Sequence, residues 1–306
     1  MSFSTKIYAN ALAQAASARL DGARLRRLIE AKTLADAFKM LGDYGFSYES
    51  GMTVDGFIIA ETNRLIEFVE DAAASKKAAD ALTARFWYNN VKLAYKSRFT
   101  DVPADGYYNV GDYAAIAHGD YDAASKRLAA ALEELDAAGE RSPQAIDLKL
   151  TRIMYEDVLA CGIQSVRRYF KAEIDLKNIL AAARMRKLGV RRDELVRGGG
   201  VPVSLIEEAM NADGFADVLQ NTRYAELVER LDDDKFAELW SFELASDDYL
   251  YCLTDSTVAN MTSYAPFLNY YTQTLIELKT LKTALVCIKT DARDMFYKRM
   301  PALYKD

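Results

Sequence analysis

The sequence has few of the residues that interrupt helices, build metal sites or cross membranes. It holds 5 prolines, 15 glycines, 3 cysteines and 1 histidine among 306 residues. So few prolines favour long helices over strands and tight turns. The single histidine, His118, excludes zinc motifs that need a histidine pair, and its place before Gly119 predicts the end of a helix. No apolar run approaches the roughly 18 residues that span a bilayer.

The cysteines and the charge narrow the class of protein further. Cys161, Cys252 and Cys287 lie far apart and are odd in number, which predicts buried thiols in a reducing compartment. The formal net charge of −6 argues against nucleic-acid binding. Because the first residues also lack the apolar segment of a signal peptide, we expect a cytoplasmic protein from a bacterium or an archaeon.

One helical stretch recurs along the chain. Residues 173–189 carry apolar side chains at helical spacing and end in a basic turn before Gly189. Residues 87–94 and 277–284 have the same pattern. Aligning the copies pairs two sets of positions, namely Asn90, Asn178 and Thr280 and, four residues later, Ala94, Ala182 and Ala284. The copies are separated by 88 and 102 residues, which indicates domain-sized units rather than a short-repeat solenoid.

A short element that ends in tyrosine recurs as well, at Tyr44, Tyr121 and Tyr224. Its third copy lies at the N-terminus, whereas the long helices of that copy lie at the C-terminus. We therefore expect an all-α funnel of three similar units around a pseudo-threefold axis, with the chain ends meeting in space. Glycine, serine and proline cluster at 139–143 and predict a boundary there. The predicted parts are 55–143 for the first unit, 144–236 for the second, and 1–54 with 237–306 for the split third.

These features resemble the C (or d) subunit of V-type and archaeal-type rotary ATPases over almost the whole chain. The matching residues are Tyr8-Ala9-Asn10, Asp175 to Asn178 with Arg186 to Gly189, Gly198-Gly199, and Pro266 to Glu277. The sequence departs from the pattern at Thr280, where the family usually has asparagine, and at Trp87, where the second copy has Asp175. The resemblance implies a non-catalytic subunit without a cofactor. It also implies a place on the cytoplasmic face of the membrane, where the subunit joins the rotor shaft to the proteolipid ring for proton or sodium transport.

The motifs of nucleotide and diphosphate chemistry are incomplete. No G-x-x-x-x-G-K-[ST] loop is present, so direct nucleotide binding is not expected. Gly198-Gly199-Gly200 predicts a helix-to-helix turn, with an anion nest as the alternative. Asp232-Asp233-Asp234 and Asp247-Asp248 each lack the third carboxylate of a D-D-x-x-D site. Two other hypotheses stay open, namely a magnesium-dependent all-α synthase and a helical-repeat scaffold of other purpose.

Two basic runs are candidates for contact with acidic or polar loops of partners, since charge steers such association. An ordinary solvated face is the alternative for both. The stronger candidate comprises Arg184, Arg186, Lys187, Arg191, Arg192 and Arg197. The weaker one comprises Arg24, Arg26 and Arg27.

Overall fold

The computed structural model describes residues 3–16, 20–190, 193–231, 239–255 and 259–305. Within these ranges every regular element is an α-helix or a 3-10 helix, which confirms the all-α prediction. The long helices are α4 (Val54–Ala72), α5 (Lys76–Lys96), α7 (Pro143–Leu159), α8 (Gln164–Leu188), α12 (Leu239–Asp255) and α13 (Ala265–Lys289).

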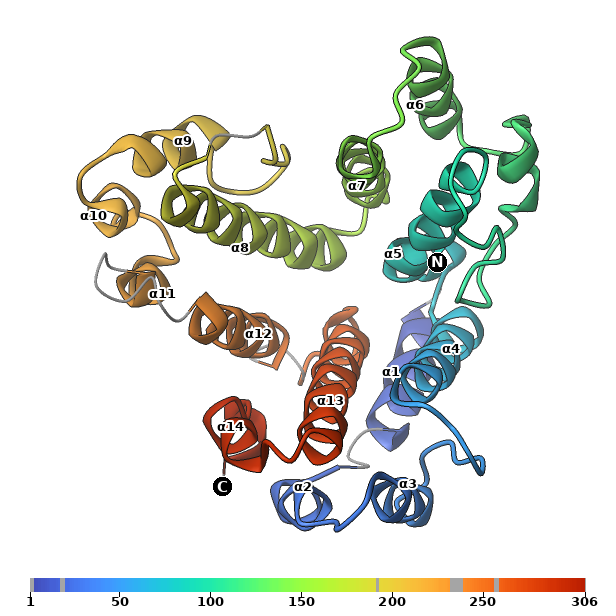
Figure 1. Cartoon of the computed structure of the whole chain (residues 1–306), viewed down its shortest axis with the longest axis vertical. Helices are drawn as coiled ribbons and strands as arrows, with labels where there is room; N and C mark the ends of the chain where they lie inside the picture. Colours follow the sequence, from blue (N-terminus) through green and yellow to red (C-terminus); the bar gives the residue numbers. More distant parts are fainter. Residues whose placement is uncertain (1–2, 17–19, 191–192, 232–238, 256–258, 306) are drawn as a thin grey trace.

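The long helices form a closed ring of three pairs (Figure 1). Contacts run from α4 to α5, on to α7 and α8, then to α12 and α13, and from α13 back to α4. Shorter helices pack against these pairs; most lie outside the ring, while the first of them lies beside α4 and α13. They are α1 (Phe3–Ala16), α2 (Gly22–Ile29), α3 (Leu34–Asp43), η1 (Ala114–His118), α6 (Lys126–Ala137), α9 (Val203–Asn211), α10 (Phe215–Leu219), α11 (Ala225–Val228), η2 (Glu229–Leu231), α14 (Arg293–Lys298) and η4 (Ala302–Tyr304).

Local sequence sets the ends of the long helices. The side chains of Thr53, Ser75 and Ser142 accept hydrogen bonds from N–H groups in the first turns of α4, α5 and α7. These caps satisfy donors that a helix start leaves without a partner. At its other end α8 stops at Gly189, whose φ of 64° lies in the left-handed region that glycine adopts readily.

The two ends of the chain share one hydrophobic core. Side chains from α2, α3 and the start of α4 pack there with side chains from α13, α14 and η4. Asn10 of α1 donates to the carbonyls of Met261 and Ser263 at 2.7 and 2.8 Å, just before α13 begins. Arg293 likewise donates to the carbonyls of Ile29 and Ala31. The ring is therefore closed by contacts between segments more than 200 positions apart in sequence.

Several helix starts differ from the sequence prediction. The polar sequence of residues 73–80 favours a solvated connection, but these residues contain the first turn of α5, where Ser75 caps the helix and Ala78 is buried. The helix expected from 173 begins earlier, at Gln164. The alanine-rich sequence from Tyr121 to Ala138 favours a helix over its whole length, but that helix begins only at Lys126, after the Ser125 cap. The element at 114–118 is a 3-10 helix that ends at His118, as the sequence predicted, and Gly119 follows with a φ of 77°.

Candidate partner-binding cavity

Asn90 and Asn178 hold the loops that follow their helices in the same way. Asn90 donates to the carbonyl of Tyr108 at 2.7 Å and accepts from its N–H at 3.2 Å. Asn178 makes the same pair of bonds with Val196, at 2.7 and 2.8 Å. In both copies the partner lies 18 residues after the asparagine. Since the amide side chain satisfies both the N–H and the C=O of one loop residue, each asparagine fixes the path of its loop.

Trp87 and Asp175 occupy equivalent positions and contact equivalent backbone, although their chemistry differs. Trp87 donates to the carbonyl of Asp112 at 3.2 Å, and Asp175 accepts from the N–H of Gly200 at 3.0 Å, each 25 residues further on. A side chain on the preceding glycine, Gly111 or Gly199, would collide with Trp87 or Asp175, respectively. The repeat therefore extends to the glycine that permits the close approach.

The glycine turn at 198–200 binds a carboxylate of the chain itself. Asp175 accepts from the N–H groups of Gly200 and Val201 at 3.0 and 2.9 Å and from the Tyr224 hydroxyl at 2.8 Å. Burial raises the pKa of Asp175 above its ordinary value, against the lowering effect of these donors. These two N–H groups are thus occupied by an internal anion.

The other repeat positions are buried. Ala94, Ala182 and Ala284 have no exposed surface, and each lies on a long helix of a different pair. Thr280, at the third asparagine position, is 4% exposed, and its hydroxyl donates to the carbonyl of Ile276 in its own helix at 2.7 Å. Residues of this size let neighbouring helices approach closely, and we expect Ala182→Leu to overpack this contact.

A cavity of about 1250 Å³ lies between the α7–α8 pair and the α12–α13 pair. Its lining comes from these four helices, from the start of the loop after α8, and from Arg85 of α5. Apolar side chains such as Leu176 and Leu180 alternate in the wall with charged ones. A cavity of this size with a mixed lining suits a polypeptide segment or a large ligand better than an ion.

At one end of the cavity, Glu173 gathers three donors. It accepts from Arg85 at 2.6 Å, from the Tyr155 hydroxyl at 2.6 Å and from Lys177 at 2.8 Å. Burial alone would raise the pKa of Glu173, but Arg85 and Lys177 hold it well below its usual range. The glutamate is therefore a buried, fully satisfied anion that joins α5, α7 and α8.

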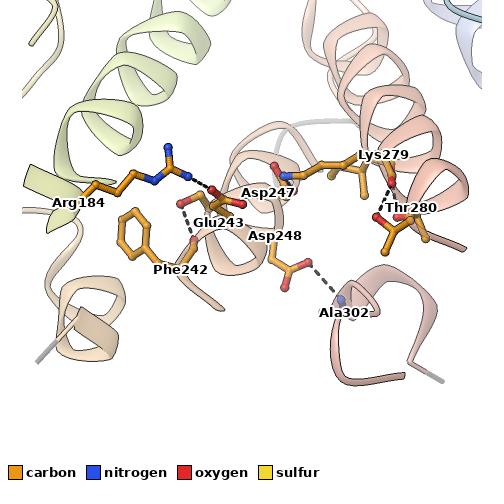
Figure 2. A network of polar contacts seen from close by, with 11 residues as sticks. Arg184, Phe242, Glu243, Asp247, Asp248, Lys279, Thr280 and Ala302 are labelled. Atoms are coloured by element: carbon orange, nitrogen blue, oxygen red, sulfur yellow. Dashed lines mark hydrogen bonds and ion pairs between the residues drawn. The ribbon is translucent and has the colours of Figure 1, made fainter. Parts of the chain in front are cut away.

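Further along the wall, ion pairs join α12 to its neighbours (Figure 2). Arg184 of α8 pairs with Glu243 of α12, and Lys279 of α13 pairs with Asp247 of α12 at 2.5 Å. Asp248 accepts from the N–H of Ala302 at 3.2 Å. Burial raises the pKa of Asp247, and the nearby Lys279 only partly offsets this.

The structure thus assigns Asp247 and Asp248 to internal contacts rather than to a magnesium site. Among the described residues no group of three potential ligands could hold a metal ion. Asp232, Asp233 and Asp234 lie outside the described residues.

The residues of the stronger basic run are spread over different surroundings. Arg184 lies in the cavity wall, whereas Arg186 donates to the carbonyls of Ala212 and Asp213 and so ties α8 to the end of α9. Lys187 and Arg197 are exposed. Arg191 and Arg192 lie outside the described residues.

The weaker basic run lies on α2. The Arg24 guanidinium lies 5.3 Å from the centre of the Tyr44 ring and 3.8 Å from Asp21. Arg26 is half-buried and Arg27 is exposed. Exposed positions such as Arg27, Lys187 and Arg197 stay candidates for partner contact, while the intramolecular bonds of Arg186 give it a role within the fold.

Sequence reasoning missed the Arg85–Glu173 pair. The signal that was available is the repeat itself, because the two residues are separated by the 88 positions that separate Asn90 from Asn178. A charged residue within the apolar stretch 81–86 also pointed to a buried partner.

A comparison with protein families found a match over almost the whole chain. The model of the family described as ATP synthase (C/AC39) subunit matches residues 9–299. A search of individual curated proteins found no match. None of the described helices combines the length and the hydrophobicity of a membrane-spanning segment.

Proposed function

The chain belongs to the ATP synthase (C/AC39) subunit family of non-catalytic rotary ATPase stalk subunits, and we propose that it joins the rotor shaft to the membrane proteolipid ring. In this role the shaft enters the cavity lined by α7, α8, α12 and α13, and the opposite end of the molecule rests on the ring. The protein would then lie on the cytoplasmic face of the membrane and serve proton or sodium transport.

The observation that supports this proposal most is the closed ring of long helices. Contacts pass from each pair to the next and return from α13 to α4. A closed ring transmits torque because rotating one pair requires its neighbours to move, and packed helices resist such movement. An open row of helices would bend at its free ends instead.

We also propose that the ring consists of three copies of one unit, at 55–143, at 144–236, and at 1–54 with 237–306. The shared loop contacts of Asn90 and Asn178 support the first two copies. The core that joins both chain ends supports the split third copy. Three similar units would present three similar surfaces to a ring of identical proteolipids.

The test is to measure two activities on membranes with and without this subunit. ATP hydrolysis by the catalytic head should survive its removal, whereas ATP-driven ion pumping should be lost and should return when the purified subunit is added back. Pumping that persists without the subunit, or ATPase activity of the purified chain, would contradict the proposal.

A further inference from the structure

The repeat places three different residues at one equivalent position beside the cavity. Arg85 and Glu173 are separated by the 88 positions that relate the first copy to the second, and Glu173 and Leu275 by the 102 positions that relate the second to the third. All three line the same cavity. The copies therefore present a cation, an anion and an apolar side chain at the point where they meet.

The cation at this point contacts all three helix pairs. The Arg85 guanidinium, from α5, donates to Glu173 of α8 at 2.6 Å. It also lies 5.6 Å from the ring centre of Phe170, on α8, and 5.8 Å from that of Tyr271, on α13. These distances fall within the range of cation–π attraction. One side chain thus holds three helices that lie far apart in sequence.

The contact between Arg85 and Glu173 is largely shielded from solvent and is supported by neighbouring contacts. Glu173 has 6% of its side-chain surface exposed and Arg85 has 25%. The Tyr271 hydroxyl donates to the carbonyl of Leu82 at 2.7 Å, which anchors α13 to the same part of α5. A guanidinium held by a carboxylate and two rings has few alternative positions, so it defines the spacing of the helices around it.

The third copy is held differently. Leu275 brings no charge to the junction, so α13 has no counterpart of the Arg85–Glu173 ion pair there. The α13 side is held by the aromatic contact between Tyr169 and Tyr271, at 6.3 Å, and by the Tyr271 hydrogen bond. The charge pair therefore fixes the position of α8 relative to α5, and the contact of Arg85 with Tyr271 links α13 to both helices.

We propose that Arg85 and Glu173 are positioning residues that set the width of the cavity in which the partner is seated. The identity of that partner as the rotor shaft rests on the proposed function. The positioning role does not, because it concerns the distance between α8 and α13 in the free protein.

The test separates positioning from stability with three variants. Arg85→Met leaves Glu173 without its buried counter-charge. The double variant Arg85→Met with Glu173→Gln removes both charges of the pair, so neither is left as a buried charge without its partner. Its denaturant midpoint should therefore lie near that of the wild type. Lys76→Met is the matched control, because it breaks an exposed pair with Asp80 on the same helix, at 3.0 Å.

The first readout is the distance between spin labels at Leu188→Cys on α8 and Lys289→Cys on α13, both exposed, in a background without the three native cysteines. Wild type and Lys76→Met should give one narrow distribution. The double variant should give a broader or shifted one despite its recovered stability. A narrow, unshifted distribution in the double variant would overturn the proposal, since the pair would then act on stability alone.

The second readout is the affinity of the complete chain for the purified rotor shaft. The double variant should bind the shaft about tenfold more weakly than the wild type, because the cavity that receives the shaft is less well preorganised. Equal affinity would count against positioning. A wild type that fails to bind the shaft would contradict the proposed function, while the label distances would still decide the role of Arg85. Should Arg85→Met fail to fold, the double variant still supplies both readouts.

Discussion

The α7–α8 pair packs against its two neighbouring helix pairs through two interfaces, which we call the first and the second seam, and these are built differently. In the first seam, where α5 meets α7 and α8, buried or half-buried polar side chains join the helices directly. They include Arg85 with Glu173, and Tyr88 with Asp157 at 2.6 Å. In the second seam, where α8 meets α12 and α13, side chains of all three helices line the cavity. The Arg184–Glu243 pair that spans it leaves 52% and 34% of the two side chains exposed.

Equivalent positions explain part of this difference. Lys92 of α5 reaches across the first seam to Thr151 of α7 at 2.7 Å, and burial lowers its pKa to about 8. The equivalent residue of α8, 88 positions later, is Leu180, which lines the cavity instead. The same helical position thus bonds to the neighbouring helix in one copy and lines the cavity in the next.

The largest effect should follow from breaking the first seam at Glu173. Glu173→Leu leaves the Arg85 guanidinium partly buried without a counter-charge, which should lower the free energy of unfolding by about 3–5 kcal/mol. Denaturant titration of the purified chain measures it. Asp80→Leu, at an exposed ion pair on α5, is the control and should change stability by less than about 1 kcal/mol. A similar, small loss in both variants would show that the first seam does not depend on this pair.

A smaller effect is expected where α8 packs through Ala182. Ala182→Leu adds volume at a position with no exposed surface, which should destabilise the fold by about 1–3 kcal/mol. Thermal unfolding compares it with Ala137→Leu, at an exposed position near the end of α6. An unchanged melting temperature for Ala182→Leu would argue against the alignment of the three alanines.

The pH dependence of stability gives a second test of the role of Glu173 in the first seam. The folded-state pKa of Glu173 lies below its ordinary value of 4.5, so this group's stabilisation is present above about pH 4.5 and is lost as the pH falls towards the folded pKa. Glu173→Gln should remove this loss, which amounts to at most about 1.4 kcal/mol per pH unit. Urea titrations between pH 3 and pH 6 measure it. Equal slopes for variant and wild type below pH 4.5 would contradict the assignment.

The smallest effect should come from the second seam. Arg184→Gln removes one member of a largely exposed pair, and such pairs contribute about 0–1 kcal/mol. Equilibrium unfolding at low and at high salt should show a small difference that salt removes. A loss as large as that of Glu173→Leu would mean that the two seams are equally dependent on charge, and the comparison would fail.

Local signals predicted those parts of the fold that depend on neighbouring residues. The helix end at Gly189 lies where the sequence predicted it, and so does the helix end before Gly119. The start of α5 has a local signal as well, because Ser75 caps that helix. The burial of Ala78 in its first turn depends on residues elsewhere in the chain, and no local pattern contains that information.

The sequence by itself determined the helical periodicity, the helix caps and the 88- and 102-residue spacings, since these depend on residue type and position alone. Only the tertiary structure decided which equivalent positions face each other. It turned Arg85 and Glu173 into a buried pair, engaged Arg186 within the fold, and placed the cavity where the α7–α8 and α12–α13 pairs face each other. The physical reason is that charge pairing and packing act over a few ångströms, whereas the partners lie tens of positions apart in the chain.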